Sequence, residues 1–180
     1  LFPTPETLQI GQAVVLASGV IPVVLIAKRL SLSPKVAAIA SAIYSLYPAI
    51  SCGCFYDIHE NCFLAPLLLW MFYFFEAEKY LPMYITALGV LSVKEDAAVY
   101  VFFFALYVIF ARQKVRHGAL LALGSLCYFG IALYILTNYG DGAMINRFNN
   151  LIFKPEDGLL GAVKTALFNP GFLLTQLFST

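Results

Sequence analysis

The chain has 180 residues, of which 61% are hydrophobic and only 12% are charged, and its formal net charge is +1. A soluble domain normally carries about a quarter charged residues, so this chain has too few polar side chains to cover a surface in water. The near-neutral charge also excludes the basic footprint of a nucleic-acid-binding protein. We therefore predict an all-α, polytopic transmembrane helical bundle whose main surroundings are the lipid bilayer.

Six apolar stretches follow one another along the chain and predict about six membrane helices. A helix that spans a membrane needs roughly 20 residues, within a range of about 17 to 25. The first and last stretches meet this length, the second and third are marginal, and the fourth and fifth are short. The stretches are residues 5–27, 34–50, 62–77, 80–93, 97–111 and 118–137.

Local signals support the first two of these helices. Ser33 precedes the second stretch as an N-cap, and Pro22 is expected to kink the first. Ala37, Ser41 and Ser45 recur every four residues. They form a stripe of small residues, which lets helices approach each other closely in lipid.

The basic residues of the short turns predict the orientation of the bundle. The turns after the first, third and fifth stretches carry seven lysines and arginines, whereas the turn at 51–61 carries none and the turn at 94–96 carries only Lys94. Positively charged turns face the cytoplasm. We therefore expect a multi-pass protein of the plasma membrane, with the turns at 51–61 and 94–96 outside. The seven basic residues are Lys28, Arg29, Lys35, Lys79, Arg112, Lys114 and Arg116.

Residues 138–180 are more polar than the membrane bundle at 1–137 and are predicted to form an external loop. Turn signals such as Asn-Tyr-Gly-Asp-Gly at 138–142 interrupt this segment. Residues 159–168 suit an amphipathic helix on the membrane surface, and the apolar residues at the end of the chain resemble the start of a further membrane helix. Because the chain begins without Met and stops within that apolar run, we expect it to be a fragment of a longer protein.

Two polar clusters interrupt the apolar pattern, and the predicted topology places both on the external side. Carboxylates and a histidine suit a divalent cation such as Mg²⁺, Mn²⁺ or Zn²⁺, and they can also act as a general base or bind a cationic group. The two clusters could therefore share one external site. The first cluster contains Asp57, His59 and Glu60, and the second contains Lys94, Glu95 and Asp96.

A purely structural interpretation of both clusters stays open. Asp57 and Glu60 have nearly the spacing of a capping box before the third stretch, and Asp96 could cap the fifth. Lys94 could simply offset the charges of Glu95 and Asp96.

Three cysteines, Cys52, Cys54 and Cys62, flank His59 in the same turn. A zinc site or an external disulfide is conceivable, but the spacing matches no standard pattern of zinc ligands. Small residues near a membrane interface are the simpler interpretation.

Three short segments carry a resemblance to a known family. The chain resembles a family of bacterial and archaeal membrane proteins known as domain of unknown function 2079, through Tyr47-Pro48, Phe55-Tyr56-Asp57-Ile58-His59-Glu60 and Lys94-Glu95-Asp96-Ala97-Ala98. Typical members show Asp-x-His-Pro-Glu and Lys-Glu-Asp at corresponding places, whereas this chain has no proline between His59 and Glu60. The resemblance extends from Phe2 to about Pro170.

That family in turn resembles the glycosyltransferase family C superfamily of multi-pass membrane enzymes. Those enzymes use lipid-phosphate-linked sugars and carry an acidic site on the outer face, so the resemblance implies a similar fold and site here. A key acidic residue of that superfamily lies in the first external loop, and we expect this part to be missing because no such loop precedes Phe2.

The resemblance and the two clusters together lead to one functional hypothesis and two rivals. The hypothesis is an enzyme that transfers a sugar from a polyprenyl-phosphate donor to an external acceptor. The rivals are a membrane transporter, against which the lack of a visible internal repeat argues, and a non-catalytic scaffold. Under the hypothesis, the catalytic residues are Asp57, His59, Glu60, Glu95 and Asp96, a divalent metal (Mg²⁺ or Mn²⁺) lies on Asp57, His59 and Glu60, and the donor phosphate meets Lys94 and Arg147.

Overall fold

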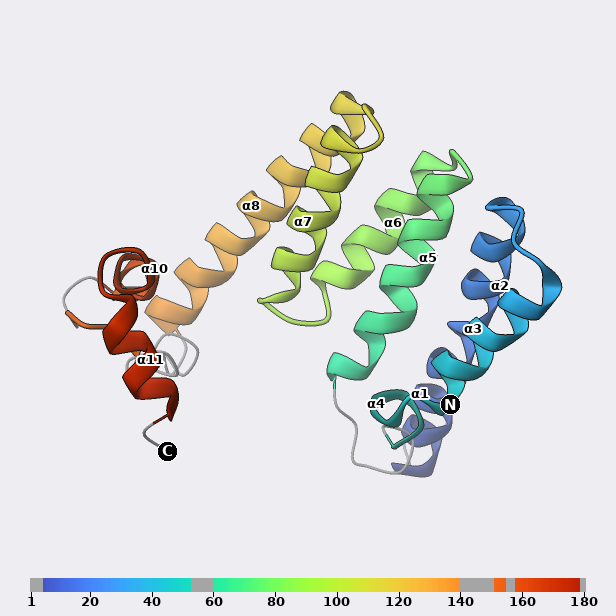
Figure 1. Cartoon of the computed structure of the whole chain (residues 1–180), viewed down its shortest axis with the longest axis horizontal. Coiled ribbons are helices and arrows are strands. Elements are labelled where there is room, and N and C mark those ends of the chain that lie inside the picture. The colour runs from blue at the N-terminus through green and yellow to red at the C-terminus, as the bar shows by residue number, and fades with distance from the viewer. Residues whose placement is uncertain (1–4, 53–59, 140–150, 155–157, 179–180) are drawn as a thin grey trace. The chain divides into compact units, whose positions relative to one another are not determined.

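The structure is a computed structural model that describes residues 5–52, 60–139, 151–154 and 158–178. Within these ranges the regular elements are all helices, as the sequence predicts (Figure 1). The elements are α1 (Pro5–Ser18), α2 (Val20–Arg29), α3 (Pro34–Leu46), α4 (Pro48–Ser51), the 3-10 turn η2 (Glu60–Phe63), α5 (Leu64–Glu76), α6 (Tyr80–Leu91), α7 (Ala97–Phe110), α8 (Val115–Tyr139), α10 (Gly158–Phe168) and α11 (Pro170–Phe178).

The first predicted helix is broken at Gly19, between α1 and α2, and Pro22 accounts for the break. Pro22 has no N–H group, so the carbonyl of Ser18, four residues earlier, loses the hydrogen bond that a helix would give it. The hydroxyl of Tyr44 in α3 enters at the break and donates to the Leu16 carbonyl at 2.8 Å. A Cβ atom on Gly19 would overlap that hydroxyl, so the close approach requires a glycine. The prediction that Pro22 distorts this helix is confirmed.

Helix α3 begins where the sequence predicts and ends earlier. The Ser33 hydroxyl accepts a hydrogen bond from the N–H of Val36 at 3.4 Å, which confirms the predicted N-cap. The helix stops at Leu46 because the next residue, Tyr47, precedes a proline and takes extended angles (φ −62°, ψ 124°). Pro48 then opens the short helix α4.

The core lies where α5, α6 and α7 pack together. In Figure 1 these three helices run alternately in opposite directions, so the turns at 77–79 and 92–96 lie at opposite ends of the core. The ring of Phe72 in α5 packs against two neighbouring rings of α7, with centroid distances of 6.0 Å to Phe104 and 5.6 Å to Tyr107. The fully buried side chains at the centre include Met71, Met83, Val90, Val101, Ala105 and Val108.

Among the described residues, two helical segments are long and apolar enough to cross a membrane by length and composition. They are Glu6–Arg29, through α1 and α2, and Val115–Tyr139, which is α8. Helices α3, α6 and α7 have 13, 12 and 14 residues. At about 1.5 Å per residue they cover roughly 20 Å of a hydrocarbon core about 30 Å thick. The predicted number of six spans stays a prediction.

Large apolar side chains cover the outward faces of these helices. More than half of the surface of Ile43, Leu81, Phe103 and Leu123 is exposed, and they come from four different helices. A soluble monomer rarely exposes apolar patches on this scale, because water makes them costly. Such a surface is the one that lipid would cover.

The chain divides into two compact units, Leu1–Gly130 and Ile131–Thr180, and α8 runs through the boundary. In the second unit, α10 occupies the predicted amphipathic helix and α11 the apolar run that follows it. The Thr165 hydroxyl of α10 accepts a hydrogen bond from the N–H of Phe153 at 2.9 Å, and the Phe153 ring lies 5.3 Å from that of Phe172. The predicted start of an external loop at residue 138 stays a prediction.

Candidate functional site

The two polar clusters meet at one end of the helical core. Lys94 Nζ, in the turn between α6 and α7, lies 3.7 Å from Glu60 Oε1, in the turn η2 that leads into α5. The Lys94 side chain is 22% exposed and that of Glu60 is 52% exposed. An ion pair this open to solvent contributes about 0 to 1 kcal/mol to stability, so it matters mainly because it shows that the two turns lie close together. Two turns that are distant in sequence are neighbours in the fold.

Backbone hydrogen bonds and packing hold the turn that carries Lys94. The N–H of Ser92 donates to the Leu88 carbonyl at 3.0 Å, and the N–H of Ala97 donates to the Lys94 carbonyl at 3.1 Å. Leu91 before the turn and Ala97 after it are both buried. The apolar ends of α6 and α7 therefore fix where the polar residues between them lie.

Asp96 does not cap α7 with its side chain, so that part of the structural interpretation is wrong. It precedes the helix with α-helical angles (φ −77°, ψ −12°), which keep the side chain from the capping position. Its Oδ1 atom is buried and has no hydrogen-bond partner among the residues that the structure describes. An unsatisfied buried acceptor costs about 1 to 3 kcal/mol. A ligand that donates a hydrogen bond to Oδ1 would offset this cost.

Three predicted site residues, Asp57, His59 and Arg147, lie outside the described residues. The predicted metal site therefore has one described member, Glu60, and its geometry stays a prediction. Within the part of the chain that the structure describes, no group of three His, Cys, Asp or Glu side chains is placed to hold a metal ion. Glu95, the remaining member of the second cluster, is half-buried beside Asp96.

Sequence reasoning missed a buried polar residue close to Glu60. Gln12 of α1 is only 2% exposed, and its Nε2 donates to Cys62 Sγ of η2 at 3.6 Å. Cys62 and Cys52 are free thiols. A buried amide needs hydrogen-bond partners, so Gln12 helps to hold α1 against the turn that carries Glu60. The only signal for it in the sequence is an amide, three residues after Gln9, inside an apolar stretch.

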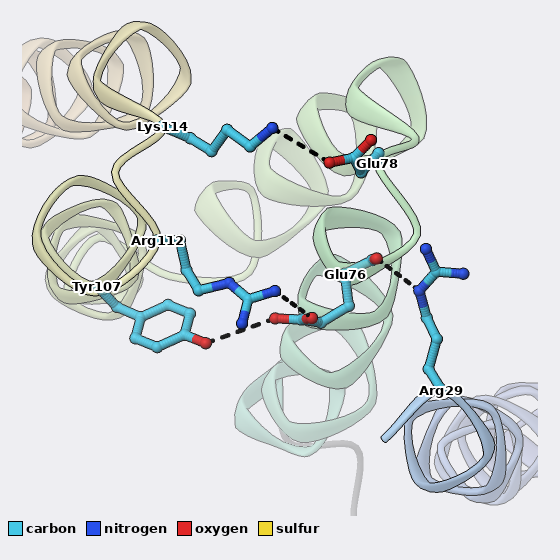
Figure 2. Close-up of polar contacts among 6 residues, drawn as sticks. All are labelled: Arg29, Glu76, Glu78, Tyr107, Arg112 and Lys114. Atoms are coloured by element: carbon cyan, nitrogen blue, oxygen red, sulfur yellow. Dashed lines mark hydrogen bonds and ion pairs between the residues drawn. The ribbon is translucent and has the colours of Figure 1, made fainter. Parts of the chain in front are cut away.

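A third polar cluster, which the sequence analysis missed, lies at the other end of the core where α5 ends (Figure 2). Arg112 Nη2, from the turn between α7 and α8, lies 2.7 Å from Glu76 Oε2. The Tyr107 hydroxyl donates to Glu76 Oε1 at 3.5 Å, and Arg29 Nε of α2 donates to the Glu76 backbone carbonyl. Because only 8% of the Glu76 side chain is exposed, it is a buried charge whose partners come from separate segments.

A more exposed ion pair accompanies Glu76 at this end. Lys114 Nζ lies 3.1 Å from Glu78 Oε1, and the two side chains are 45% and 65% exposed. The hydrogen bond from Lys114 to Glu78 raises the pKa of the lysine above its ordinary value. Glu76 and Glu78 thus connect the basic end of α2 and the turn between α7 and α8 to the end of α5.

The two ends of the core differ in their chemistry. At the Glu76 end each carboxylate is matched by a basic side chain. At the other end Glu60, Glu95 and Asp96 accompany Lys94. Carboxylates in this setting can accept a proton from a hydroxyl or bind a divalent cation, and a lysine can bind a phosphate. The Glu60 end is therefore the candidate site.

Comparison with known proteins gives one match. A protein-family model described as Predicted membrane protein (DUF2079) matches residues 1–180. No curated protein and no solved structure matches the chain.

Proposed function

Because the chain belongs to the family of predicted membrane proteins DUF2079, we propose that it is a multi-pass enzyme of the plasma membrane with a fold like that of glycosyltransferase family C. It transfers a sugar from a polyprenyl-phosphate donor to an acceptor at the external face. The observation that carries this proposal is the 3.7 Å contact between Lys94 and Glu60, one from each polar cluster. The family membership supports the membrane setting, and the resemblance to glycosyltransferase family C supplies the reaction.

The proposed orientation is supported by the basic turns that meet the end of α5. At its end, Glu76 and Glu78 contact Arg29, Arg112 and Lys114, which belong to two of the basic turns. Basic turns face the cytoplasm, so the beginning of α5 is external in this proposal. Helices α3, α5, α6 and α7 then count as spans, and the bilayer thins around them or their turns lie below its surface.

In the proposed reaction, an acceptor hydroxyl attacks the anomeric carbon of the donor sugar. The bond from that carbon to the phosphate oxygen breaks, and polyprenyl phosphate leaves. Asp96 takes the hydroxyl proton, and Glu95 shapes the acidic site around it. The buried Asp96 Oδ1, which lacks a partner among the described residues, supports this role. Lys94 and Arg147 bind the phosphate of the donor.

Asp57, His59 and Glu60 are the proposed ligands of a divalent metal, Mg²⁺ or Mn²⁺. Carboxylate oxygens suit these hard cations, and the Glu60 side chain is 52% exposed. When bound, the ion would offset the negative charge of the donor phosphate.

Asp96→Asn and Lys94→Ala are each expected to lower the rate of sugar transfer about 100-fold or more. Asparagine keeps the size of Asp96 but cannot take a proton, and alanine removes the cation that faces the phosphate. The measurement uses proteoliposomes that contain the intact protein and a polyprenyl-phosphate donor with a radiolabelled hexose. Label recovered in product separated from the donor gives the rate.

Glu78→Gln, at the opposite end of the core, is the matched control and should leave the rate unchanged. A chelator should lower the wild-type rate, and Mg²⁺ or Mn²⁺ should restore it. Transfer at the wild-type rate by both Asp96→Asn and Lys94→Ala would refute the proposed site and favour the scaffold. Solute uptake that depends on a counter-ion, and that both variants abolish, would instead identify a transporter.

A further inference from the structure

An open apolar groove lies between α6, α7 and α8 in the first unit. Its volume is about 360 Å³. Leu88 and Leu120 at its rim are 64% and 59% exposed, so the groove opens to the surroundings of the helices. In a bilayer those surroundings are lipid. The groove is lined chiefly by Leu88, Leu91, Val101, Leu120, Leu121 and Gly124.

The groove has the size and chemistry to hold a single hydrocarbon chain. A cavity of about 150 Å³ lined by apolar side chains binds benzene, so a volume of about 360 Å³ accommodates roughly a dozen carbon atoms. Gly124 contributes to this space, because a Cβ atom on it would meet nothing within 4 Å. The lining is almost entirely apolar, so a polar ligand would lose its hydration without gaining partners there.

Polar and basic residues follow the groove lining along α8 toward the basic turn. Tyr84, which lines the groove, has its hydroxyl 2.8 Å from His117 Nδ1, and the His117 ring stacks on Tyr80 at 3.7 Å between centroids. Arg116 precedes Leu120 by four residues, so both lie on the same face of α8, with Arg116 one turn closer to the basic turn.

The charge of Arg116 is available to a ligand. Lys114, two residues earlier, is held by Glu78. Arg116 is exposed, and the ion pairs found among the described residues do not include it. A guanidinium group binds a phosphate through two parallel hydrogen bonds, and basic pockets between membrane helices bind anionic lipid head groups.

We propose that this groove binds one acyl chain of an anionic phospholipid, whose phosphate lies on Arg116. The lipid belongs to the leaflet that borders the basic turns. The binding site depends on the protein lying in a membrane, but it is independent of sugar transfer and of the cluster around Lys94.

Native mass spectrometry of the intact protein, released from neutral detergent micelles, tests the groove. Phosphatidylglycerol and phosphatidylcholine are added in separate titrations, and bound lipids are counted. Gly124→Leu fills the groove and is expected to reduce phosphatidylglycerol binding at least fivefold. Gly130→Leu is the matched control, since Gly130 lies on the same helix, also has open space around it and does not line the groove. It should bind lipid like the wild type.

Substitutions of Arg116 test the head group. Arg116→Gln should weaken phosphatidylglycerol binding about fivefold and leave phosphatidylcholine binding unchanged, and Arg116→Lys should restore most of the difference. Equal binding of the two lipids by the wild type would overturn the role of the phosphate. Equal lipid counts for Gly124→Leu and Gly130→Leu would overturn the groove itself. The spectra also show whether the wild type forms a dimer. If it does, and Gly124→Leu loses the dimer with no change in bound lipid, the proposal is overturned and the groove is assigned to a second copy of the chain.

Discussion

Replacing Glu76 with alanine is expected to lower the free energy of unfolding by about 1.5 to 3 kcal/mol, because it removes hydrogen bonds to a charged group. Only 8% of the Glu76 side chain is exposed, and its carboxylate accepts hydrogen bonds from Arg112 and Tyr107 (Figure 2). Removing it leaves the Arg112 guanidinium, which lies 6.0 Å from the centroid of the Phe75 ring, without its carboxylate. The change is measured by titrating the purified protein in mixed micelles with sodium dodecyl sulfate and following helix content.

Glu78→Ala provides the matched comparison, because the Lys114–Glu78 pair has the same kind of groups in a more exposed setting. Its effect should stay within about 0.5 kcal/mol, since solvent screens exposed pairs. Adding Arg112→Ala to Glu76→Ala should cost little more than Glu76→Ala alone, because the ion pair is already gone. Equal effects of Glu76→Ala and Glu78→Ala would contradict the importance of burial at Glu76.

Replacing Gly118 with alanine is the second change with a large expected effect. A Cβ atom there would overlap the Ile109 side chain and lie 2.9 Å from the backbone carbonyl oxygen of Ala105. The backbone of α7 cannot yield as a flexible side chain can, so α7 and α8 must move apart. We expect a loss of about 1 to 3 kcal/mol in the free energy of unfolding, measured by the same titration.

Gly130→Ala is the control on the same helix, where a Cβ atom would meet nothing within 4 Å. Alanine favours a helix over glycine by up to about 1 kcal/mol, so this variant should be slightly more stable than the wild type. The two substitutions are chemically identical and are predicted to have opposite signs. Stabilisation by both would mean that α7 and α8 do not approach as closely as the structure has them.

The fold was largely predictable because apolar runs and their boundaries mark these helices. Ser33 and Pro22 also had the predicted effects, since a cap and a missing N–H act within one turn of their own position. The end of α3 at Leu46 was missed, although Pro48 signals it, because the apolar run continues to Ile50 and hides the boundary. The number of spans stays a prediction because several helices are too short for length alone to decide.

The candidate site was predictable only in its broad placement. Alternation of basic turns predicted that Glu60 and Lys94 lie at the same end of the bundle, and their 3.7 Å contact agrees with that prediction. The Asp96 cap was wrong because capping depends on backbone angles, which the sequence does not reveal. Gln12 and Glu76 were missed because their burial comes from neighbouring helices, and a single polar residue in the sequence gives no sign of that burial.

Labelling of single cysteines from outside the cell tests most directly whether the two clusters share the external face. Asn61 beside Glu60 and Ser92 beside Lys94 are both exposed, so each is replaced by cysteine in a chain without its four native cysteines. Lys79, exposed in a basic turn, is the control position. We predict that an impermeant maleimide labels positions 61 and 92 in intact cells and labels position 79 only after lysis. Labelling of position 79 in intact cells, or protection of either position 61 or position 92, would contradict a shared external site.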